Sequence, residues 1–137
     1  MTNSGVLITA NLVHTQEISY SESGDIATDL GNILNSSEIT ELRTLYGADF
    51  VVLLVDCDCS GVGYLTLNGD YAYNVTDIDY IPFFTFHHEI GHNCNLEHDW
   101  DNATSVPNRY NYGFKECNTA PFFRTVMSYD CAGSTWA

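Results

Sequence analysis

The hydrophobic and polar positions of the first half of the chain predict several β-strands. Residues 6–20 are rich in β-branched and aromatic side chains that alternate with polar ones, which predicts one or two strands. Residues 48–55 form a continuous apolar run, which is typical of a central strand buried on both faces. Residues 61–67 and 71–75 predict two more exposed strands on either side of the Asn68-Gly69 turn, and we expect the last to lie at the sheet edge.

Apolar residues at helical spacing separate the first of these strands from the apolar run. Residues 25–34 predict a short helix whose N-cap is Asp25. Ser36 or Ser37 can cap a second helix that ends at Gly47. The positions expected to face inward from this second helix are Ile39, Leu42 and Leu45.

A third helix, predicted over residues 83–93 after Ile81-Pro82, carries the main chemical signal. His88 and His92 are four residues apart, so they project from the same helical face. Glu89 follows the first histidine directly, where its carboxylate can reach water on a shared ion without becoming a ligand. We expect three phenylalanines to bury the start of this helix against the sheet: Phe83, Phe84 and Phe86.

His98 is the expected third ligand, provided that the helix stops and the chain turns back. Asn95 suits that turn, because asparagine is the commonest alternative to glycine in the left-handed conformation. Three neutral imidazoles leave a tetrahedral Zn²⁺ with one open position. The alternative is an amphipathic helix with solvent-facing histidines, but four of the five histidines lie within residues 87–98.

These motifs resemble the metzincin metallopeptidases. The zinc motif reads His88-Glu89-x-x-His92-x-x-Asn95-x-x-His98-Asp99, and Thr125-Val126-Met127-Ser128-Tyr129 is similar to the Met-turn. Residues 124–131 and 42–49, with the aspartate after the third histidine, look most like the reprolysin-type and peptidyl-Asp metalloendopeptidase-like branch. Asn95 departs from the glycine that the family has at this position.

The resemblance implies an α+β, layered fold over residues 1–137 as a single domain. It implies a mixed twisted sheet with an active-site helix and Met-turn, although the first strand and helix of metzincins are missing here. An edge strand beside the cleft would receive an extended peptide.

The resemblance also implies a zinc-dependent endopeptidase in which Glu89 moves the protons. Met127 would form an apolar floor beneath the imidazoles, and Tyr129 would stabilise the oxyanion or simply pack. Asp99 would orient the end of the motif through a hydrogen bond, or remain exposed at the helix end.

The charge of the chain limits its partners and suggests a substrate preference. A net charge of −14 argues against nucleic acid or an anionic membrane, and no apolar run is long enough to span a bilayer. The first residues show no signal-peptide pattern. Three of the four cations, Arg109, Lys115 and Arg124, fall in the segment expected to wall the cleft. They favour cleavage next to Asp or Glu, unless they merely offset an acidic surface.

Five cysteines point to an oxidising compartment and hence to secretion. We expect Cys117 to pair with Cys131 around the Met-turn region, while Cys94 is either the spare thiol or the partner of Cys57 or Cys59. Calcium is a further possible ligand, against the alternative of a solvated acidic face. The acidic and amide residues that suggest it are Asp56, Asp58, Asp70, Asp77, Asp79, Asn68 and Asn74.

Two other functions compete with the endopeptidase. The chain can be an inactive fragment, or a zinc-binding interaction module that retains the three-histidine site without proteolysis. An acidic calcium-binding adhesive domain is the third hypothesis. Measurement of zinc content together with proteolysis separates the first two from the enzyme, and calcium-dependent thermal stability would identify the third.

Overall fold

The computed structural model describes residues 9–104 and 110–131, and these form a mixed α and β fold as predicted. The expected strands are wrong for residues 9–20, which contain neither helix nor strand. Most of these residues are exposed, and none of them forms a backbone ladder with a strand, although Ile18 packs against the core. Residues 6–8 of that expectation lie outside the described residues.

Both predicted N-terminal helices are confirmed. α1 (Ile26–Leu34) is capped by Asp25, which accepts a hydrogen bond from the N–H of Ala27. α2 (Ser37–Tyr46) is capped by Ser36 and ends at Gly47 in the left-handed conformation (φ 61°). Leu45 was expected to face inward from α2, but it is 73% exposed, so that expectation was wrong. Ile39 is the residue that α2 buries in the core.

The sheet is mixed, as expected, but its strand order differs from the prediction. β3 (Tyr73–Asp77) is central, with β1 (Val51–Val55) parallel on one side and β2 (Gly61–Gly63) antiparallel on the other. The apolar run is therefore an edge strand and exposes half of Leu54, so its prediction as the doubly buried central strand was wrong.

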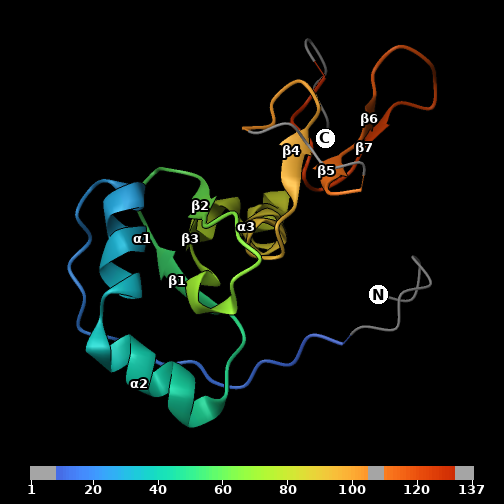
Figure 1. Cartoon of the computed structure of the whole chain (residues 1–137). Helices are drawn as coiled ribbons and strands as arrows, with labels where there is room; N and C mark the ends of the chain where they lie inside the picture. Colours follow the sequence, from blue (N-terminus) through green and yellow to red (C-terminus); the bar gives the residue numbers. More distant parts are fainter. Residues whose placement is uncertain (1–8, 105–109, 132–137) are drawn as a thin grey trace.

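Helices cover the two faces of this sheet differently (Figure 1). Tyr73 and Val75 of β3 pack with Ile33 of α1 in the apolar core. Asn74, which alternates with them, donates a hydrogen bond to Asn93 of α3 (Thr85–Asn93) on the opposite face. The central strand can therefore contain buried polar residues, because each one is hydrogen-bonded.

Short elements connect and follow these layers. The 3₁₀ helices η2 (Gly69–Tyr71) and η3 (Ile78–Phe83) flank β3. After α3, β4 (Glu97–Asp99) pairs with β5 (Tyr112–Gly113), and β6 (Lys115–Glu116) pairs with β7 (Phe123–Arg124). Figure 1 shows α3 between the sheet and this C-terminal segment. No helix in the described part of the chain is long and apolar enough to cross a membrane.

Candidate metal centre

The three predicted histidines converge on one point. The Nε2 atom of His98 lies 3.1 Å from the Nε2 atom of His92 and 3.1 Å from that of His88. His88 and His92 come from successive turns of α3, and His98 comes from β4.

Backbone carbonyls fix the orientation of all three rings. The Nδ1 atom of His88 lies 2.9 Å from the carbonyl oxygen of Val126, and the Nδ1 atom of His92 lies 2.8 Å from that of Leu96. The Nδ1 atom of His98 lies 3.3 Å from the carbonyl oxygen of Asn102. A carbonyl oxygen only accepts, so each Nδ1 carries the hydrogen, and each neutral ring then turns an Nε2 lone pair toward the other two. Three lone pairs facing one another in this way fit a shared cation.

The ionisation of the histidines agrees with this arrangement. Burial lowers the pKa of His92 to about 4, and the neighbouring imidazoles add to the effect. The pKa of His88 is also lowered, mainly by burial and further by the charges of His98 and Arg124. Neutral imidazole is the form that binds a metal.

The turn after α3 takes the predicted form. Asn95 has φ 62°, and the N–H of Leu96 donates to the carbonyl oxygen of Gly91 at 2.9 Å. The amide of Asn111 donates to the carbonyl oxygen of Asn95 at 3.0 Å, so a distant loop secures the same turn. This reversal brings His98 back toward the helix.

Glu89 lies beside the three imidazoles in an open cavity of about 580 Å³. The residue is only 4% exposed, and burial raises the pKa of its carboxyl to about 8. The carboxyl therefore holds its proton at neutral pH until a positive charge lies nearby.

Two glycines of β2 make room for Glu89. A Cβ at Gly61 would lie 2.7 Å from its Oε1 atom, and a Cβ at Gly63 would lie 2.9 Å from its carbonyl oxygen. α3 therefore packs directly onto the backbone of β2.

Met127 is buried beneath α3, where its sulfur occupies the space that a side chain at Gly91 would need. Ser128 is also buried, and its N–H donates to the carbonyl oxygen of Thr125 at 3.0 Å. A residue larger than glycine at position 91 would displace the methionine from the helix.

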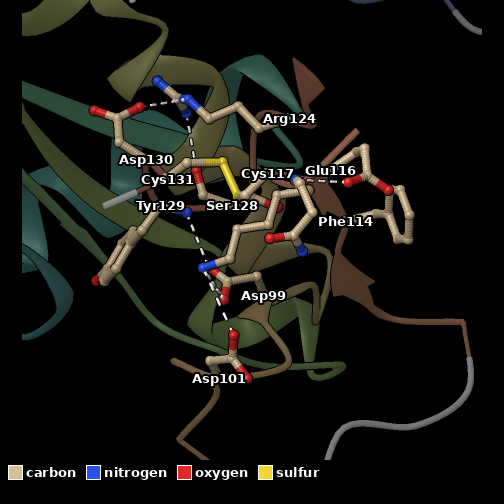
Figure 2. Close-up of a disulfide and its surroundings, with 12 residues drawn as sticks. Asp99, Asp101, Phe114, Glu116, Cys117, Arg124, Ser128, Tyr129, Asp130 and Cys131 are labelled. Atoms are coloured by element: carbon tan, nitrogen blue, oxygen red, sulfur yellow. Dashed lines mark hydrogen bonds and ion pairs between the residues drawn. A yellow bond between two sulfur atoms is a disulfide. The ribbon is translucent and has the colours of Figure 1, made fainter. Parts of the chain in front are cut away.

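Asp99 connects the zinc-motif strand to the C-terminal loop (Figure 2). Its carboxylate accepts the N–H of Tyr129 at 2.9 Å and forms an ion pair with Lys115 at 2.7 Å. Burial would raise the pKa of Asp99, but these contacts and a bond from Asn102 outweigh it and lower the pKa. The ring of Tyr129 lies 4.4 Å from the ring of His98, centroid to centroid.

The sequence matches the model of metallo-peptidase family M12 over residues 2–136. The chain belongs to metallo-peptidase family M12.

Curated relatives agree with this family. The peptidyl-Asp metalloendopeptidase of Stenotrophomonas maltophilia (strain K279a) is 34% identical over 145 aligned positions, which cover 96% of this chain and 34% of that protein. The peptidyl-Asp metalloendopeptidase of Pseudomonas aeruginosa is 31% identical over 117 positions, which cover 72% of this chain and 19% of that protein. The chain therefore spans about a third or less of the length of these relatives.

One solved structure has a similar fold. A chain from a study described as "Structure of a chaperone-substrate complex" aligns with a TM-score of 0.61 and 19% identity. The alignment covers 77% of this chain and 17% of that one. At this identity the likeness concerns the fold alone.

The three basic residues of this M12 chain that were predicted to contact the substrate do not come together in the structure. Arg124 lines the cavity, with Nε 2.7 Å from a carboxylate oxygen of Asp130. Lys115 does not line that cavity, because Asp99 holds it in the adjoining loop. Arg109 lies outside the described residues.

Two of the three phenylalanines at the start of α3 do not bury it against the sheet, so that expectation was wrong for them. Phe83 and Phe84 are 70% and 59% exposed and line the cavity, whereas Phe86 is half-buried. Phe84 has φ 67° at the junction of η3 and α3, so the regular helix begins only at Thr85.

The cysteines form two pairs in this structure. Cys117 pairs with Cys131 as expected, Cys57 pairs with Cys59, and Cys94 is the spare thiol, exposed at the helix end. Outside the histidines, the described residues bring together one further group of possible ligands, Asp77 with Cys57 and Cys59, but the disulfide between the two cysteines leaves no thiolate there to bind a metal. The calcium expectation remains a prediction.

Sequence reasoning missed the residues that seat α3 on the sheet. Asn93 donates to the carbonyl oxygens of Tyr64 at 3.0 Å and Tyr73 at 2.9 Å, and its own oxygen accepts from Asn74. The Gly-x-Gly spacing of β2 was a visible signal, since glycine in a strand marks a close backbone approach.

Proposed function

We propose that this chain is the catalytic domain of a zinc-dependent endopeptidase that hydrolyses internal peptide bonds next to acidic residues. The observation that carries the proposal is the set of three Nε2 lone pairs that meet beside Glu89 in one cavity. Family membership supports a metallopeptidase, and the name peptidyl-Asp metalloendopeptidase of the relatives supports the acidic preference.

The ligands of the zinc ion would be His88, His92 and His98. When bound, zinc supplies a Lewis acid that polarises a carbonyl and lowers the pKa of water. Glu89 would take a proton from the attacking water and return it to the leaving amine. Its place in the same cavity, at the adjoining position of α3, supports this role.

The remaining residues would shape the cleft. Met127 would serve as the apolar floor, which its burial against Gly91 supports. Tyr129 would stabilise the developing oxyanion, and Asp99 would hold that tyrosine through its backbone N–H.

The substrate would add a strand to β2. Its residues line the cavity, and β2 rather than β3 is the outer strand on this side of the sheet. An extended peptide placed there would gain main-chain hydrogen bonds and pass in front of Glu89. The two cysteine pairs support an extracellular location.

The test measures zinc content and cleavage of casein by the protein and its Glu89→Gln variant. We expect about one zinc per chain in both proteins and a loss of kcat of at least about 100-fold in the variant, because proton transfer contributes about 10²–10⁴-fold. Glu41→Gln on exposed α2 is the matched control and should cleave normally. If both the parent protein and the Glu89→Gln variant bound zinc but neither cleaved casein, the result would instead favour the interaction module.

A further inference from the structure

Arg124 is the cation that faces the catalytic cavity within the described residues. Arg43 is held elsewhere by backbone carbonyl oxygens, including that of Asp49 at 2.7 Å and that of Gly69 at 2.6 Å. Lys115 is committed to Asp99. The carboxylates that line the cavity belong to Glu89, Glu97 and Asp130. Among the described residues, Arg124 is therefore the cationic side chain that can pair with an acidic side chain of the substrate there.

The guanidinium of Arg124 is held in place by two contacts, which use only some of its N–H donors (Figure 2). Nη1 donates to the carbonyl oxygen of Ser128 at 2.8 Å, and Nε lies 2.7 Å from Asp130 Oδ1. A guanidinium has five N–H donors. Among the described residues, no hydrogen bond from Nη2 is present, so donors remain for a second carboxylate.

The contact between Arg124 and Asp130 can be exchanged. The two side chains are 32% and 57% exposed, and an ion pair in such a setting contributes only about 0–1 kcal/mol. A substrate carboxylate that approaches in a bidentate manner offers two charge-assisted hydrogen bonds in its place.

The backbones of both residues are fixed. Arg124 pairs with Lys115 across β6 and β7, and Asp130 precedes Cys131, which is bonded to Cys117. The loop can therefore keep its shape while the carboxylate of Asp130 rotates away.

We infer that Arg124 selects the acidic side chain of the substrate and that Asp130 occupies its guanidinium until the substrate carboxylate displaces it. This inference rests on the proposed function and adds to it the selecting residue and its internal competitor. Asp130 thereby lowers the affinity for acidic substrates while keeping the arginine in place.

The test compares two peptides that differ only by Asp against Asn at one position next to the scissile bond. Binding is measured by fluorescence anisotropy on the zinc-loaded Glu89→Gln protein, so that no cleavage is needed. Cleavage is measured as kcat/KM on the protein with Glu89 intact. Both readouts use the full chain, with Arg124→Gln, Arg124→Lys and Asp130→Asn each introduced in turn.

We expect Arg124→Gln to reduce the Asp-to-Asn preference at least 10-fold in binding and in kcat/KM, and Arg124→Lys to reduce it less. Asp130→Asn should tighten binding of the Asp peptide several-fold and leave the Asn peptide unchanged. Asp101→Asn is the matched control, because it removes an equally negative, exposed carboxylate that does not line the cavity.

Three results would overturn the inference. These are equal binding of both peptides by the Glu89→Gln protein, an unchanged preference in Arg124→Gln, and equal tightening of both peptides in Asp130→Asn. Failure of the proposed function looks different, because the zinc-loaded protein would then cleave neither peptide while the binding comparison still reports on Arg124.

Discussion

The cavity has two walls that are held in place by different means. The helix wall, formed by α3 and β2, is seated on the central sheet by Asn93 and by the glycine backbone of β2. The loop wall, formed by residues 123–131, contains one two-residue strand and depends on cross-links. These are the Cys117–Cys131 bond and the Asp99 contact to Tyr129.

This difference separates folding from substrate recognition. The helix wall carries His88, Glu89 and His92, and it shares its contacts with the core strand β3. Damage there should lower global stability and metal binding together. The loop wall carries Tyr129 and Arg124, so local damage should first change how the substrate is held.

The largest expected effect comes from removing the cross-link of the loop wall. The Cys117→Ser/Cys131→Ser variant opens a bridge with a sequence separation of 14 residues. A loop of this size corresponds to about 3 kcal/mol of unfolding free energy in the chain-entropy model. We expect urea denaturation to show a loss of that order, together with a raised KM and retained zinc.

Cys94→Ser is the control for this change, because Cys94 is exposed and forms no disulfide. Its unfolding free energy should stay within about 0.5 kcal/mol of the parent protein. Loss of zinc from the double variant would show that the two walls are not independent.

A smaller loss of unfolding free energy should follow from Gly63→Ala in the helix wall. The added Cβ would lie 2.9 Å from the carbonyl oxygen of Glu89, so helix and strand must separate. Overpacking of this kind costs about 1–3 kcal/mol, which urea denaturation can measure. We expect zinc affinity to fall as well, since α3 carries two of the three proposed ligands.

Gly69→Ala in η2 is the matched control, because a Cβ there has no atom within 4 Å. The two variants should differ clearly in unfolding free energy. Equal stability of the two would mean that α3 can move away from β2 without cost, which contradicts the close packing described above.

The same contrast explains which parts of the fold were predictable. The histidine spacing, the left-handed Asn95 and the caps of α1 and α2 depend on neighbours within a few residues, so the sequence predicts them. The strand order depends on distant partners. β3 contains Asn74 and Asp77, and only the partners from α3 and the Cys57 to Cys59 turn make its burial favourable.

The loop wall was predictable only in part. The pairing of Cys117 with Cys131 followed from their position around the methionine, and Arg124 reached the cavity as expected. Lys115 did not, because its nearest carboxylate belongs to the zinc motif itself. The sequence shows that both cations lie in the expected segment, but it does not show which carboxylate each one contacts. The geometry of the loop therefore determines that Arg124 lines the cavity and that Lys115 does not.

The smallest expected effect is on stability at acidic pH, and it arises from a residue outside both walls. Asp29 of α1 accepts hydrogen bonds from the hydroxyl of Tyr20 at 2.5 Å and the N–H of Ser23 at 2.9 Å. Burial would raise the pKa of Asp29, but these bonds outweigh it and lower the pKa. A lowered pKa gives stability that is present above the unfolded value of about 3.9 and is lost as the pH falls through the folded value.

Asp29→Asn should therefore flatten the dependence of unfolding free energy on pH below about pH 4, compared with the parent protein. Urea denaturation at about pH 6 and about pH 3 measures the difference between the two slopes. Because Asp29 lies on α1, across the sheet from α3, zinc content at neutral pH should not change in this variant. An unaltered slope in Asp29→Asn would mean that other carboxylates govern acid unfolding. The candidates would then be Asp77 of β3, Asp99 of β4 and Glu116 of β6, which also have lowered pKa values.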